Sequence, residues 1–66
     1  MKITLNGTES QVDEGIRMAD LVAQLGLGGR RIAVEVNAEL VPRSTFAEHS
    51  LRPGDRVEII QAVGGG

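Results

Sequence analysis

The chain has 66 residues, a formal net charge of −2, a single aromatic residue, Phe46, and no cysteine. A chain of this length forms one small domain with little room for a substrate pocket, and without cysteine it has neither a disulfide framework nor a thiolate nucleophile. The mildly acidic charge and the lack of further aromatic residues argue against nucleic acid as a partner, because single-strand binders usually combine a basic groove with aromatic stacking platforms.

The first twelve residues have the pattern of a β-hairpin. Met1, Ile3 and Leu5 alternate with polar residues, which is the period of a strand with one buried face. Asn6-Gly7 follows and predicts a type I′ turn, because both central residues of that turn need a positive φ. Residues 8–12 are then expected to form the returning strand.

A helix of about two turns is predicted next. Four apolar side chains share one helical face at the spacing i, i+3, i+4 and i+7: Met18, Leu21, Val22 and Leu25. Gly26 suits the position just after the helix, where a left-handed conformation is common. The start is poorly marked, because residues 15–17 include no Ser, Thr, Asp or Asn, and Asp13 is the nearest candidate cap.

The second half of the chain alternates again. In residues 31–36, Ile32, Val34 and Val36 are expected to face inward and Ala33 outward. Residues 39–41 predict a short strand that lies at a sheet edge, because the following Pro42 has no N–H to donate.

The remaining segments lead into the last strand. Phe46, in a loop or short helical turn over residues 44–50, is expected to fill part of the core. Pro53 and Gly54 then predict a type II turn before a final strand over residues 56–63.

The order strand, strand, helix, strand, short strand, strand indicates an α+β roll of two layers, with one helix covering one face of a mixed sheet. If the first and last strands are central neighbours, they run parallel and the helix supplies a right-handed crossover.

Few side chains suggest catalysis. His49, between Glu48 and Ser50, is the single histidine, and a solvated loop position is favoured over a catalytic triad. Three acidic residues on strands are interpreted as a solvating face, and no metal site is expected: Glu35, Glu39 and Glu58. Arg30 and Arg31 are interpreted as surface charges.

The end of the chain is the most informative part. Gly64, Gly65 and Gly66 follow the last strand, and such a run predicts either a thin arm that presents a carboxylate or a linker. An apolar surface beside the arm could dock a partner, although exposed apolar residues are also ordinary. The candidates for that surface are Ile60, Ala62, Val63 and Ala33.

Across its whole length the chain resembles the β-grasp sulfur carrier proteins, most closely the thiamine-biosynthesis carriers of the ThiS family. The segments that carry the resemblance are, in order, 1–7, 21–27, 32–37, 39–43, 54–59 and 63–66. No single segment is specific, but the set in this order is. Two residues depart from the family pattern: Ala38 stands in a turn where glycine is frequent, and Arg17 stands where a capping threonine is common.

The resemblance implies a β-grasp (ubiquitin-like) roll with a mixed sheet of about five strands and one main helix. Residues 1–63 would form the domain and residues 64–66 a flexible tail. The resemblance implies that the chain is not an enzyme and binds no cofactor, but serves as a protein substrate of other enzymes. A ubiquitin-activating-type adenylating enzyme would use ATP to adenylate the Gly66 carboxylate, a sulfur donor protein would convert it to a thiocarboxylate, and thiazole synthase would accept the sulfur.

No apolar run reaches the ~20 residues that cross a bilayer, and Met1 leads directly into a strand pattern, so we expect a cytoplasmic protein that is monomeric when free, with no membrane partner.

Three alternatives stay open. The small subunit of molybdopterin synthase has the same chemistry and a Gly-Gly end, but it is usually longer and richer in core aromatics. A ubiquitin-type modifier would join Gly66 to lysines. A noncovalent β-grasp module would not need Gly66 at all.

Overall fold

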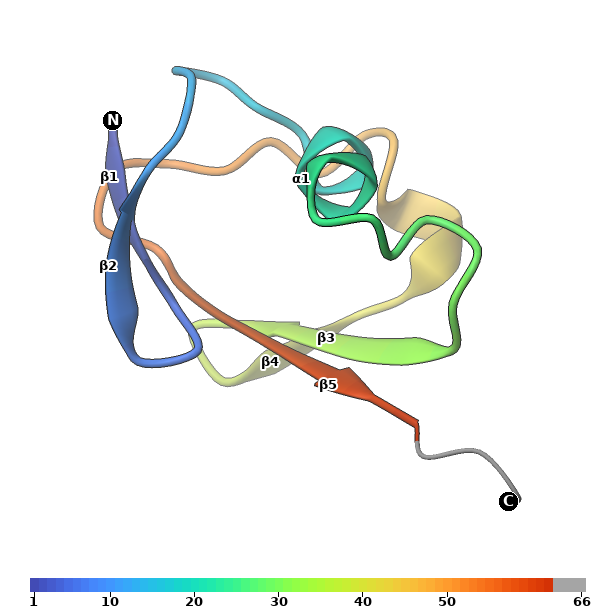
Figure 1. Ribbon diagram of the computed structural model, residues 1–66. Helices are drawn as coiled ribbons and strands as arrows, with labels where there is room; N and C mark the ends of the chain where they lie inside the picture. The colour runs from blue at the N-terminus through green and yellow to red at the C-terminus, as the bar shows by residue number, and fades with distance from the viewer. Residues whose placement is uncertain (63–66) are drawn as a thin grey trace.

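Two layers, a sheet and a helix, make up the computed structural model, which describes residues 1–62 (Figure 1). Within those residues the elements follow the predicted order: β1 (Lys2–Leu5), β2 (Thr8–Gln11), α1 (Met18–Gln24), β3 (Ile32–Val36), β4 (Glu39–Val41), a short 3₁₀ helix (Arg43–Thr45) and β5 (Arg56–Gln61). The described part of the last strand therefore ends at Gln61, and the predicted domain boundary after Val63 lies outside the described residues.

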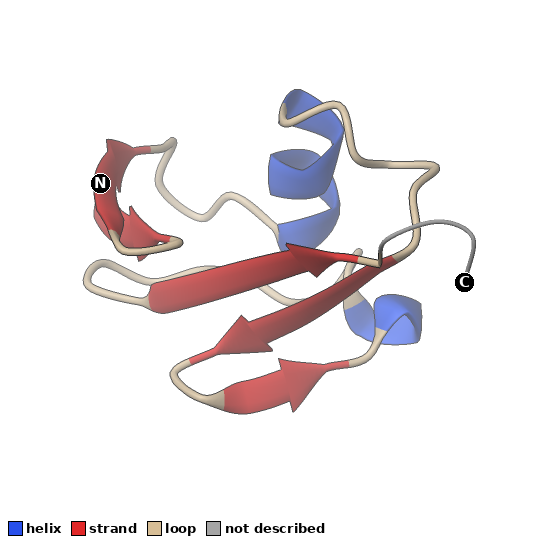
Figure 2. Ribbon diagram, turned by 60° about the horizontal axis from the view of Figure 1, so that its bottom comes forward, coloured by secondary structure: helices blue, strands red, loops and turns tan. Residues whose placement is uncertain are grey.

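The strands form one mixed sheet in the order β2-β1-β5-β3-β4. β5 is central, parallel to β1 and antiparallel to β3, while both hairpins are antiparallel. The predicted parallel pairing of the first and last strands is confirmed, and so is the edge position of β4. Figure 2 shows α1 over one face of the sheet, and in residues 1–62 no helix covers the opposite face.

Both hairpins turn through residues with positive φ. Asn6 and Gly7 have φ of 49° and 82°, as the predicted type I′ turn requires. The β3–β4 turn uses Asn37 and Ala38 at 54° and 69°. The Cβ of Ala38 makes this left-handed conformation unfavourable, whereas glycine adopts it freely.

Backbone carbonyls from the segment before β5 cap the start of α1. The N–H of Met18 donates to the His49 carbonyl at 2.8 Å, and the N–H of Ala19 donates to the Phe46 carbonyl at 3.0 Å. The N-cap residue is Arg17, whose own N–H donates to the Asp20 carboxylate at 3.4 Å. Asp13 was therefore wrong as the candidate cap.

The helix ends in a Schellman motif. The N–H of Gly26, at φ 74°, donates to the Ala23 carbonyl at 3.0 Å, and the N–H of Leu27 donates to the Val22 carbonyl at 2.9 Å. This reversal corrects one prediction, because Leu25 does not join the buried face and is 42% exposed. Leu27 packs against the core in its place.

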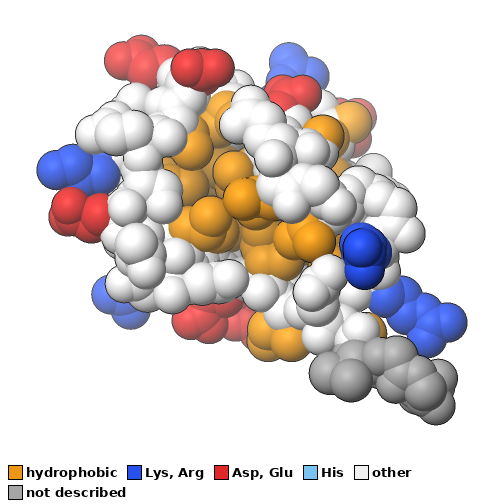
Figure 3. Space-filling view, viewed as in Figure 1, with side chains coloured by type: hydrophobic (Ala, Val, Ile, Leu, Met, Phe, Trp, Pro, Cys, Tyr) orange, Lys and Arg blue, Asp and Glu red, His pale blue; other side chains and the backbone are white. Residues whose placement is uncertain are grey.

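Twelve buried apolar side chains form one core between the sheet and the helix: Ile3, Ile16, Met18, Leu21, Val22, Val34, Val36, Val41, Phe46, Leu51, Val57 and Ile59. The core role predicted for Phe46 is confirmed. Figure 3, in the same view as Figure 1, shows hydrophobic side chains in the space between the N-terminal hairpin and α1. Over residues 1–62, α1 is too short to cross a bilayer and no other helix qualifies.

We predict that Ala38→Gly raises the free energy of unfolding by about 0.5–1 kcal/mol, because the left-handed strain at φ 69° disappears. The melting temperature should rise by about 2–8 °C, measured by circular dichroism. Gly7→Ala is the matched control, since a Cβ there meets nothing within 4 Å and only the φ of 82° opposes it. It should lose about 1–2 kcal/mol. A less stable Ala38→Gly protein would show that the turn is not strained.

Candidate functional site

The predicted docking residues meet on the sheet face opposite α1, at the end of β5. Ile60 is 59% exposed and pairs directly with Ala33 on β3. Ala62 follows, and its N–H donates to the Arg31 carbonyl at 3.0 Å. Three of the four predicted docking residues are therefore neighbours. Val63 and the tail, Gly64, Gly65 and Gly66, lie outside the described residues.

Strand alternation produces this arrangement. Val57 and Ile59 are buried under α1, so Ile60 must emerge on the opposite face. On β3 the buried Val34 fixes Ala33 in the same way. The register then places Ile60 across from Ala33, because the two neighbouring inward residues, Ile59 and Val34, are also paired.

Sequence reasoning missed Leu40, which is 68% exposed on the same face. Val41 pairs with Val34 in the core, so the preceding Leu40 points outward and pairs with Glu35. The signal was present in the alternation of Leu40 with the inward Val41. We call the surface formed by Ala33, Leu40, Ile60 and Ala62 the outer apolar patch.

Two carboxylates border the outer apolar patch. Glu35 lies between Leu40 on one side and Glu58 on the other, since it pairs with both across the sheet. Like charges placed directly opposite each other on a sheet are destabilising. A basic group on a docked partner would relieve that repulsion at this side of the patch, whereas Arg31 lies beside Ala62 at its other end.

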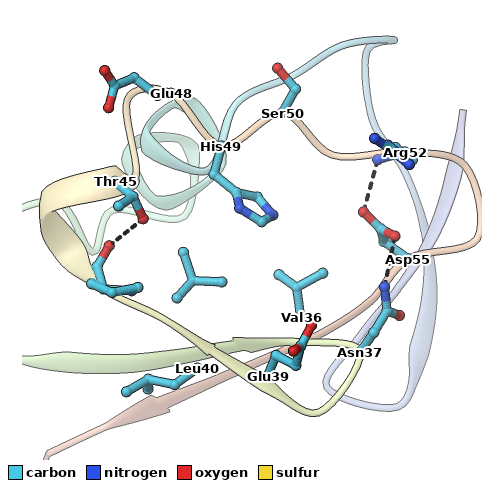
Figure 4. Close-up of a pocket in the computed structure, with 12 residues that line it drawn as sticks. Val36, Asn37, Glu39, Leu40, Thr45, Glu48, His49, Ser50, Arg52 and Asp55 are labelled. Atoms are coloured by element: carbon cyan, nitrogen blue, oxygen red, sulfur yellow. Dashed lines mark hydrogen bonds between the residues drawn. The ribbon is translucent and has the colours of Figure 1, made fainter.

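His49 belongs to a different surface. It lines an open groove with a volume of about 620 Å³ between the β3–β4 hairpin and the segment that precedes β5. Figure 4 shows the imidazole pointing into the groove while the side chains of Glu48 and Ser50 point away from it. These three side chains therefore do not form a catalytic triad. The length of the chain predicted little room for a pocket, and the structure differs in having this groove.

The three acidic strand residues do not converge either. Glu39 lines the groove, whereas Glu35 and Glu58 lie on the outer face. Within residues 1–62 no group of three or more His, Cys, Asp or Glu side chains could hold a metal ion.

The paired arginines are exposed, as expected for surface charges. Arg31 lies beside Ala62 through the backbone hydrogen bond already described. Arg30 is at the end of a loop whose carbonyls accept hydrogen bonds from the Arg43 guanidinium, one at Gly28 and one at Arg30 itself. Arg43 therefore ties the loop before β3 to the segment after β4.

Comparison with known proteins matches the chain from end to end. The model of the ThiS family matches residues 2–66. The sulfur carrier protein ThiS of Escherichia coli K12 is 30% identical, and the match covers the whole of both chains. A crystal structure of the thiamine biosynthesis protein ThiS from Geobacter metallireducens is 33% identical, covers both chains fully and has a TM-score of 0.85.

A second kind of relative is longer. The thiazole synthase of Paramagnetospirillum magneticum is 38% identical over all 66 residues, but the chain spans only 20% of that protein's length. The thiazole synthase of Magnetococcus marinus matches at 35% identity, again over 20% of its length. Together with the mixed five-strand sheet and single α-helix, the solved relative confirms the β-grasp fold. On the family model and the full-length match to the Escherichia coli carrier, the chain belongs to the ThiS family.

Proposed function

We propose that this chain is a sulfur carrier for the thiazole step of thiamine biosynthesis, with the sulfur carried on the carboxyl group of Gly66. The observation that carries the proposal is the family match, which extends over residues 2–66 and so includes the three glycines. The full-length similarity to a named sulfur carrier supports it. In this role the chain is a protein co-substrate of other enzymes and holds no cofactor of its own.

The chemistry requires activation of the carboxylate, because carboxylate oxygen is a poor leaving group. A partner adenylating enzyme of the ubiquitin-activating type joins the Gly66 carboxylate to the α-phosphate of ATP and releases pyrophosphate. A persulfide on a sulfur donor protein then attacks the acyl carbon and displaces AMP. Reductive cleavage of the remaining S–S bond by a thiol leaves the thiocarboxylate. The chain has no cysteine, so none of its own thiols can intercept the adenylate.

Docking and delivery are divided between two parts of the chain. The outer apolar patch supplies contact area, and Glu35 and Glu58 favour a basic rim on the partner. Gly66 is the fourth residue after Ala62, so the carboxyl group can extend at most about 14 Å from the end of the described chain. For the transfer to occur, a partner that docks on the patch must place its reacting atoms within that distance of Ala62.

Thiazole synthase is the proposed acceptor. In two relatives of that name, a segment similar to this whole chain makes up a fifth of a longer protein, which supports a working association between the two activities. The sulfur donor protein and the adenylating enzyme are proposed from the resemblance to the sulfur carrier family. The proposed location is the cytoplasm, where ATP is available, and the absence of cysteine is compatible with that reducing compartment. The proposed free form is a monomer.

Incubation with the cognate adenylating enzyme, ATP and a sulfur donor should exchange one oxygen of Gly66 for sulfur, seen by intact-mass spectrometry with fragmentation to locate the change. The intact mass of the protein purified from its natural source is measured first. This mass shows whether Gly66 is the carboxyl-terminal residue, as the chemistry requires. Deletion of Gly66 should abolish the exchange and leave the circular dichroism spectrum unchanged, because no core residue lies beyond Ile59 in the described chain. An unchanged wild-type mass, with an enzyme proven active on another carrier, would contradict the proposal.

Ile60→Thr keeps a β-branched side chain in β5 but removes apolar contact, and it should weaken binding to the adenylating enzyme by roughly tenfold. Leu40→Thr should act in the same direction. Stability should change by less than about 1 kcal/mol in each, because both side chains are largely exposed. Binding is measured by isothermal titration calorimetry.

Leu25→Ser is the matched control for this series, since Leu25 is an exposed leucine at the end of α1. It should leave affinity unchanged. Equal weakening by Leu25→Ser and Ile60→Thr would move the docking surface away from the outer apolar patch.

A further inference from the structure

We infer that Asn6 is a positioning residue for sulfur transfer, because its side chain holds the end of β5 that carries Ile60 and leads to Gly66. The inference rests on the proposed function and adds to it a residue from the opposite end of the sequence. Asn6 lies in the β1–β2 turn, yet it bonds to a residue 53 positions later.

The side chain of Asn6 continues the parallel ladder between β1 and β5. The N–H of Thr4 donates to the Asp55 carbonyl and the N–H of Asn6 to the Val57 carbonyl, both at 2.9 Å. In a regular parallel pair, the next bond along would run from the Ile59 N–H to the main-chain carbonyl of Asn6. Here the Ile59 N–H donates instead to Asn6 Oδ1 at 2.8 Å.

The second half of the same carboxamide completes the substitution. Asn6 Nδ2 donates to the Ile59 carbonyl at 3.3 Å, where a further residue of a longer β1 would have offered its N–H. A carboxamide has both a donor and an acceptor, so this one side chain supplies the two hydrogen bonds that successive peptide groups of a longer β1 would have made. The replacement is needed because Asn6, with φ of 49°, turns its own main chain away toward β2.

This contact matters because β1 ends before β5 does. The register pairs β1 with β5 only at Arg56 and Val57, whereas β3 accompanies β5 as far as Gln61. Within residues 1–62, Asn6 is the last group bonded to the β1 side of β5. Ile60, at the centre of the outer apolar patch, follows the clamped Ile59 directly.

The chain contains its own comparison for this arrangement. Asn37 occupies the other hairpin turn with nearly the same φ, 54°, and its Oδ1 accepts a hydrogen bond from the Arg56 N–H at 3.0 Å. Its Nδ2 donates to the Asp55 carboxylate at 3.0 Å. Asn37 thus holds the beginning of β5 and Asn6 holds the part nearer its end, and in both the Oδ1 accepts a hydrogen bond from a β5 N–H.

The functional consequence concerns how well the end of β5 is ordered before a partner binds. If Ile59 is held in the free protein, the patch and the root of the tail are already placed when a partner arrives. Without Asn6, part of that ordering must occur on binding, which raises the KM for the carrier more than it lowers kcat. Loss of the Asn37 side chain also removes two hydrogen bonds, but Asn6 still holds Ile59 next to the patch.

The experiment compares Asn6→Gly with Asn37→Gly in the full chain, since glycine accepts the positive φ at both turns. Amide hydrogen exchange should accelerate roughly five- to tenfold at Ile59 in the first variant and at Arg56 in the second. In the adenylation reaction with ATP and the adenylating enzyme, Asn6→Gly should raise the KM for the carrier by roughly three- to tenfold and change kcat by less than about twofold. Asn37→Gly should keep the wild-type KM for the carrier. Asn6→Asp, which retains the acceptor for the Ile59 N–H but loses the donor, should fall between wild type and Asn6→Gly.

Circular dichroism establishes that each variant is folded, and Asn6→Asp carries the test if Asn6→Gly does not fold. Equal KM values for the Asn6 and Asn37 variants, with wild type active, would overturn the role of Asn6 and leave the proposed function standing. Unchanged exchange at Ile59 would also overturn it. A wild-type protein that is not adenylated at all would overturn both.

Discussion

The central position of β5 is the constraint on which the rest of the structure depends. β5 pairs with β1 on one side and β3 on the other, and its inward residues Val57 and Ile59 belong to the core. Because β1 and β5 are parallel, the chain must cross between them over one face of the sheet, and α1 lies on that face (Figure 2). The opposite face is left for outward residues, among them Ile60. One strand therefore supplies the core, sets the topology and carries the candidate docking surface.

Core and site use alternate residues of the same strands, so the requirements of folding and of recognition are largely separate. Val34 is buried while its neighbour Ala33 is exposed, and Val41 is buried while Leu40 is exposed. A substitution on the outer face removes little buried area, and one on the inner face leaves a cavity. The exception is Asn6, whose side chain contributes to the sheet ladder and to the placement of the outer face at the same time.

The sequence was sufficient to predict the parts of the structure that have local patterns. Period-two alternation predicted that Ile60 and Ala33 share the outer face, and Asn6-Gly7 predicted the first turn. Helical periodicity failed for Leu25, because it does not register where Gly26 reverses the chain. The helix start had no N-cap side chain to mark it, since the N–H groups of Met18 and Ala19 donate to main-chain carbonyls of His49 and Phe46. The role of Asn6 could not be predicted, because its partner Ile59 is defined only by the tertiary pairing.

Those carbonyl caps also make the start of α1 depend on residues that come later in the chain. The first turn of α1 is completed by residues that lie after β4, and β1 finds its parallel partner only when β5 has been made. Contacts between distant parts of a chain delay folding, because the intervening loop must close before they stabilise anything. During synthesis, a chain that has not reached Phe46 lacks both carbonyl caps of α1, and a chain that has not reached β5 lacks the strand that pairs with β1 and β3. Ala33 and Ile60 can pair only after β5 has been synthesised, so a recognition surface made of both residues distinguishes a chain that includes β5 from a shorter one.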